Sequence, residues 1–158
     1  MTRFELIKWL HVLGATVLFG TGLGTAFHCW LAHLSREPRA IAVVLANVVR
    51  ADWLFTLTSG IVQPVTGFML LGELGLDWRS ESWVAASLVL YLLALACWLP
   101  VVHLQIRMSR MAGDAIDTGS ALPAAYYRAM KLWFALGWPA FLALVAVFWL
   151  MIAKPVLW

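Results

Sequence analysis

The sequence predicts an all-α fold, an integral membrane four-helix bundle with kinked transmembrane helices. Of its 158 residues, 63% are hydrophobic and only 12% are charged, and the mean hydropathy is +0.87. This composition is too apolar to cover the surface of a soluble domain. Four apolar runs are long enough to span a bilayer, and none alternates in polarity as barrel strands do. They lie near 5–31, 53–73, 83–106 and 130–153 and fill one domain, 1–158.

The first run begins near Phe4 and is too long for a signal peptide, so we expect a retained helix. Residues 37–52 predict an amphipathic start to the second helix, and 112–121 are typical of a loop. A proline lies inside each of the other three spans and frees a backbone carbonyl that a neighbouring helix must satisfy. These are Pro64, Pro100 and Pro139.

The basic residues predict the orientation of the bundle. Loops 32–52 and 107–131 share one side and hold seven Lys and Arg residues, whereas the opposite side holds four. The positive-inside rule places the richer side in the cytoplasm and both termini outside. The net charge of +3 reflects this bias, and the sequence contains no nucleic-acid-binding motif. The expected surroundings are a lipid bilayer.

Three of the four histidines lie within apolar sequence, where an ionisable side chain marks a functional site by default. His28 and His103 follow the midpoints of parallel spans by similar distances, so the two imidazoles are expected at similar depth. Two imidazoles at one depth could ligate one haem b iron from opposite faces. His33 lies just beyond the boundary of the span.

His11 precedes His28 by roughly 26 Å along the helix and cannot reach the same iron. We therefore expect one or two haems, with His11 holding the second near the outer boundary. Its iron would be five-coordinate or would take a methionine, because thioethers are known axial ligands. Met69 and Met151 approach the required depth.

Small and basic residues flank the candidate ligands. Gly24 and Gly14 each share a helix face with a nearby histidine and could make room for a porphyrin. Lys8 and Arg107 each lie one turn closer to water than a histidine and could anchor propionates. Alternatively, these cations merely snorkel, and Gly20 with Gly24 forms a GxxxG helix-packing motif.

The segments IKWLHVLGATVLFGTGLGTAF, ADWLFT, QPVTGF, CWLPVVHLQIRM and LWFALGWPAF resemble an uncharacterised family of bacterial four-helix membrane proteins. That family is distantly similar to the copper resistance D proteins and to HemJ-type protoporphyrinogen oxidase. The oxidase also opens with a lysine, a leucine and a histidine, here Lys8, Leu10 and His11. The resemblance implies a bacterial inner-membrane location and a haem b role for His11. The oxidase's later proline-arginine motif is missing, and the resemblance assigns no reaction.

The leading hypothesis is a haem b-binding inner-membrane cytochrome that transfers electrons, with a quinone, a small oxidant or a redox protein as partner. Such a protein could be a membrane oxidoreductase, although no catalytic residue is identified. A second hypothesis is copper handling by soft ligands. Those ligands are His11, His28, Cys29, Met69 and His103. A third is a non-catalytic subunit, or a homo-oligomer, that packs through the glycine face of the first helix.

Overall fold

A computed structural model describes all residues, 1–158, and contains helices and no strands. Four continuous helical stretches are long and apolar enough to cross a membrane, which confirms the all-α membrane bundle. The second stretch comprises α2, a short π-helical turn (η1) and α3. The bounds are α1 Arg3–Ser35, α2 Pro38–Ala51, η1 Asp52–Thr56, α3 Leu57–Leu74, α4 Ser82–Thr118 and α5 Ala124–Ala153.

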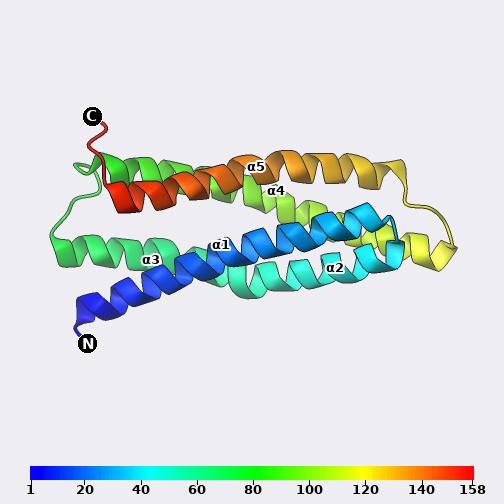
Figure 1. The fold of residues 1–158 in the computed structure, drawn as a ribbon, viewed down its shortest axis with the longest axis horizontal. Coiled ribbons are helices and arrows are strands. Elements are labelled where there is room, and N and C mark those ends of the chain that lie inside the picture. The colour runs from blue at the N-terminus through cyan, green and yellow to red at the C-terminus, as the bar shows by residue number, and fades with distance from the viewer.

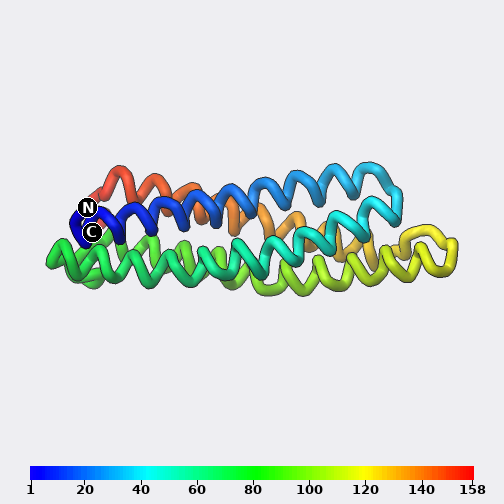
Figure 2. The backbone as a smooth tube through the Cα atoms, turned by 90° about the horizontal axis from the view of Figure 1, so that it is seen from below, coloured from blue at the N-terminus to red at the C-terminus, as the bar shows by residue number.

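The helices form an elongated up-down bundle with both chain ends at the same end of the molecule (Figure 1). α1 and α4 run away from that end, and α2–α3 and α5 return to it. The view turned by 90° shows the same arrangement (Figure 2). α1 packs against α2, η1 and α3, whereas α4 packs mainly against α5 and α2. The bundle therefore consists of two helix pairs that face each other.

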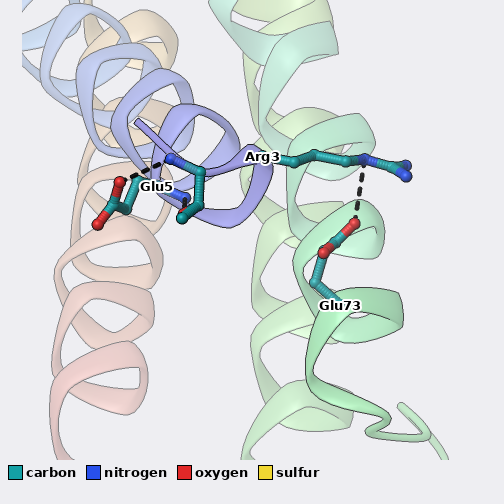
Figure 3. A network of polar contacts seen from close by, with 4 residues as sticks. Arg3, Glu5 and Glu73 are labelled. Carbon is teal, nitrogen blue, oxygen red and sulfur yellow. Dashed lines mark hydrogen bonds and ion pairs between the residues drawn. The ribbon is translucent and has the colours of Figure 1, made fainter.

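Helix ends follow local sequence signals. Thr2 and Glu5 form a capping box at the start of α1. In the same region Arg3 Nε lies 3.1 Å from Glu73 Oε1, which ties the first turn of α1 to the end of α3 (Figure 3). This ion pair is largely exposed, so it contributes little to stability.

The prediction of a loop over 112–121 is wrong for most of that segment. α4 continues to Thr118 and ends at Gly119, whose φ of 62° is the left-handed conformation that terminates helices. Ala112 and Ala115 are buried in the hydrophobic core. Tertiary packing thus extends the helix through a segment whose Gly and Asp content favours a turn.

Of the three carbonyls freed by prolines, the one opposite Pro64 is satisfied from a neighbouring helix, as predicted; no side chain bonds those opposite Pro100 and Pro139. Pro64 has no N–H for the carbonyl of Gly60, four residues earlier. The hydroxyl of Tyr91 on α4 donates to this Gly60 carbonyl instead. The bond joins the middle of α3 to α4, which otherwise belong to opposite helix pairs.

Hydrophobic packing is concentrated at the end of the bundle away from the termini. A cluster of 15 buried residues there joins α1, α2, α4 and α5, and its centre includes Met108, Ile41 and Tyr126. Near the termini the corresponding cluster has only four members. These are Leu71, Trp83, Val84 and Leu150. The less densely packed middle and terminal parts of the bundle contain the cavities described next.

Candidate functional site

Two cavities lie between the helix pairs. The terminal cavity has a volume of about 590 Å³ and is lined by residues of α1, α3, α4 and α5, including His11. The central cavity has a volume of about 670 Å³ and also reaches η1, with Asp52 in its wall. Both volumes suit an organic ligand. The cavities are adjacent because they share five wall residues, namely Leu18, Phe19, Pro64, Tyr91 and Leu144.

His11 is half-buried in the wall of the terminal cavity, and its Nδ1 has a hydrogen-bond partner on α3. Its Nδ1 lies 2.8 Å from Thr66 Oγ1. The Thr66 hydroxyl has one hydrogen and donates it to the Val62 carbonyl at 2.6 Å. When the hydroxyl donates to Val62 it can only accept from His11, an arrangement that favours the neutral tautomer with the ring hydrogen on Nδ1. In that tautomer Nε2 keeps its lone pair and can bind a metal.

A second bond from α3 holds the backbone beneath this ring. Gln63 Nε2 donates to the His11 carbonyl at 2.8 Å. The amide fits because position 14 is glycine: a Cβ there would lie 2.7 Å from Gln63 Nε2. Gly14 lines neither cavity, so in this structure it makes room for the amide that supports His11. Gly67 similarly accommodates the imidazole, whose Cε1 would lie 3.4 Å from a Cβ at that position.

Replacing Gly14 with alanine is expected to displace the Gln63 amide and to lower the free energy of unfolding by about 1 kcal/mol, the value of one hydrogen bond. The matched control is Gly24→Ala, because a Cβ at Gly24 meets no atom within 4 Å. Unfolding in mixed micelles, followed by tryptophan fluorescence, measures both variants. In a Gln63→Ala background the cost of Gly14→Ala should fall sharply, leaving only the 3.3 Å contact with Val62 Cγ1. An undiminished cost there would contradict this role of Gly14.

Two lysines border the terminal cavity at its exposed end. Lys8 from α1 lies 6.0 Å above the Phe4 ring, and Lys154 after α5 lies 5.4 Å above the Trp83 ring. Both ammonium groups are exposed, and all four residues line the cavity. Met151 lines it as well, whereas Met69 does not and is 41% exposed.

The structure places His28, His103 and Arg107 on the exposed surface of the bundle, outside both cavities. Their neighbours explain this position. Cys29 is buried beside the exposed His28, and Leu104 and Gln105 are buried beside the exposed His103. Successive residues point in directions about 100° apart around a helix. The structure does not bring His28 and His103 together at a cavity.

The remaining predicted features lie apart from the cavities. Gly20 and Gly24 face open space, so nothing in the chain covers the GxxxG face. His33 Nδ1 lies 3.2 Å from the Tyr126 hydroxyl. The chain contains no group of three or more His, Cys, Asp or Glu side chains that could hold a metal ion. Haem is a different case, because a single axial ligand can hold it.

A polar network in the wall of the central cavity was not predicted from the sequence. Thr56 Oγ1 donates to Asp52 Oδ1 at 2.8 Å. With the Gln105 amide nitrogen facing the carboxyl group, Nε2 donates to Asp52 Oδ2 at 2.9 Å and Oε1 accepts from Trp133 Nε1 at 3.3 Å. Asp52 begins the π-helical turn, a distortion that is frequent at functional sites. The available signal was a carboxylate at the start of the second predicted span and an amide at the end of the third.

Residues 5–155 match the family model described as "Predicted integral membrane protein (DUF2269)". No curated protein and no solved structure shows detectable similarity to the chain. The resemblance to the copper resistance D and HemJ-type proteins therefore stays a prediction. The family description names no ligand, reaction or partner, so an interpretation of function depends on the chemistry of the two cavities.

Proposed function

The chain belongs to this family of predicted integral membrane proteins, and from that premise we propose that it is a membrane b-type cytochrome with haem in the terminal cavity. The observation that carries the proposal is the hydrogen bond between His11 Nδ1 and Thr66 at the wall of this cavity. An imidazole whose Nδ1–H is bonded to a fixed acceptor offers Nε2 to a metal, and such an outer bond orients most histidine ligands. The Thr66 hydroxyl supplies this bond to His11.

The rest of the terminal cavity also suits a haem. Its volume of about 590 Å³ and its mostly apolar walls fit a porphyrin-sized molecule. Lys8 and Lys154 lie where the cavity meets water, and two ammonium groups match two propionates. Met151 offers a thioether to the same space, and methionine is a known axial ligand.

A bound haem would supply one-electron transfer. The contribution of the chain is to hold the ligand imidazole in one tautomer, to exclude water with apolar walls, and to place cations at one edge. His28 and His103 have no part in this proposal, because neither lines the terminal or the central cavity. The haem would exchange electrons with a quinone, a small oxidant or a redox protein.

We further propose a bacterial inner-membrane location with both termini outside. The loop at the start of α2 and the α4–α5 region carry most of the basic residues, and the positive-inside rule places that end of the bundle in the cytoplasm. The terminal cavity would then lie near the periplasmic surface.

The absorbance spectrum of the purified protein tests the haem proposal. The chain is produced in cells supplied with a haem precursor, purified in detergent, and also titrated with haem b. We expect a Soret band and, after reduction by dithionite, sharp α and β bands at close to one haem per chain. A protein that is folded by circular dichroism but neither retains nor takes up haem would refute the proposed function.

A further inference from the structure

Asp52 is a buried carboxylate without a cationic partner. It is 4% exposed and lies within the second candidate membrane span. The nearby Arg50 donates instead to Asn47 Oδ1 at 3.1 Å. The ion pair between Arg3 and Glu73 is the only one in the chain, and it lies at the terminal end.

The hydrogen bonds around Asp52 match its ionised form. Each carboxylate oxygen accepts a bond, Oδ1 from Thr56 and Oδ2 from Gln105, and an ionised carboxylate is a pure acceptor. The Trp98 indole N–H is buried without a hydrogen-bond partner and lies close to the same carboxyl group. A buried charge is costly unless an opposite charge accompanies it, and neutral donors supply none.

The central cavity beside Asp52 has room for a molecule that carries this missing charge. Its volume of about 670 Å³ is far larger than a bare metal ion needs and suits an organic ligand. Aromatic rings attract cations through their faces and pack against apolar groups. The cavity is lined by Phe19, Trp98, Trp133, Phe134, Trp138 and Phe141.

The central cavity is also accessible from the hydrocarbon region of the bilayer. Leu23 on α1 and Trp138 on α5 both line it, and each is 52% exposed at mid-helix. A lipophilic molecule dissolved in the membrane could therefore enter between these helices without crossing a polar surface.

We propose that the central cavity binds a lipophilic organic cation. Its ammonium or phosphonium group lies beside Asp52, and its apolar body lies against the aromatic rings. Three features together favour this ligand class. They are the charge of a single unpaired carboxylate, the aromatic lining and the lateral opening. Asp52 and Trp138 line the central cavity and not the adjacent terminal one, so the inference does not rest on haem binding.

Isothermal titration with tetraphenylphosphonium tests the inference on protein in nanodiscs, with empty nanodiscs as the reference. We expect saturable binding to the unmodified chain and a loss of about 30-fold in affinity for Asp52→Asn, as for a buried charge pair that loses one partner. Asp114→Asn, at an exposed carboxylate, should leave affinity unchanged. Tetraphenylborate, which has the same shape and the opposite charge, should bind no more weakly to Asp52→Asn than to the unmodified chain.

A second pair of variants addresses the aromatic lining and does not depend on the folding of Asp52→Asn. Trp138→Leu should weaken phosphonium binding, whereas Trp149→Leu should not, because Trp149 is exposed and lines neither cavity. Equal affinity of Trp138→Leu and Trp149→Leu, or of Asp52→Asn and the unmodified chain, overturns the inference. If sodium chloride displaced the bound phosphonium as effectively as a tetraalkylammonium salt does, Asp52 would be a site for an inorganic cation. This result would also overturn the inference.

Discussion

Replacing His11 with alanine is expected to abolish the Soret band of the purified protein. His11 is the only histidine that lines either the terminal or the central cavity, so its removal leaves the terminal cavity without an imidazole. We expect haem affinity to fall by about 100-fold or more, since an axial ligand is lost outright rather than reoriented. The measurement is a haem titration followed by absorbance, with the retained haem quantified after purification.

The other intramembrane histidines provide matched controls for this variant. His28→Ala and His103→Ala remove imidazoles from exposed positions, and both proteins should keep the Soret band and its intensity. Free imidazole should partly restore haem binding to His11→Ala, because the lost side chain leaves space for it. If His103→Ala lost the band and His11→Ala kept it, haem would lie outside the terminal cavity and our assignment would be wrong.

The helices themselves could be predicted from the sequence because lipid imposes a simple constraint. Every backbone polar group in the membrane must be satisfied, so a long apolar run becomes a helix. The sequence also predicts that consecutive helices run antiparallel, since short connections join neighbouring helices. The extension of α4 to Thr118 did not follow, because it depends on burying Ala112 and Ala115 against α2 and α5.

The functional residues were harder to predict because depth along a helix does not determine the face. His28 and His103 were paired by depth, yet both lie beside, rather than on, the buried face of their helices. On α4 that face follows Val101, Leu104, Gln105 and Met108, a spacing of three and four residues that passes over position 103. This spacing places Gln105, and not His103, on the buried face of α4.

The contact that prepares His11 could not be predicted, because it joins residues 55 positions apart. Gln63 and Thr66 are polar residues in an apolar span, but nothing in the sequence specifies which helix they face. The π-helical turn at Asp52–Thr56 has no local signal either. Its first residue, Asp52, bonds Thr56 within the turn and Gln105 on α4, and the second contact joins residues far apart in the sequence.

Thr66→Val is expected to weaken haem binding about 10- to 100-fold, the usual cost of losing the outer bond to a histidine ligand. Valine keeps the shape of threonine but cannot accept the Nδ1 hydrogen of His11, so the ring can adopt the tautomer that places its hydrogen on Nε2. Thr66→Ser retains a hydroxyl and should preserve most of the affinity. Haem titration and the absorbance of the reduced protein report both variants.

Thr16→Val is the stringent control for this prediction. Thr16 lines the terminal cavity and donates to the carbonyl four residues earlier, Val12, at 2.9 Å, as Thr66 does toward Val62. It makes no bond to a histidine, so its replacement removes a hydroxyl from the cavity wall itself, whereas Thr66 is buried beside His11 and does not line the cavity. Equal losses in Thr16→Val and Thr66→Val would mean that wall polarity governs haem affinity. A loss of haem affinity confined to Thr66→Val would show that the affinity depends on the hydrogen bond between Thr66 and His11 Nδ1.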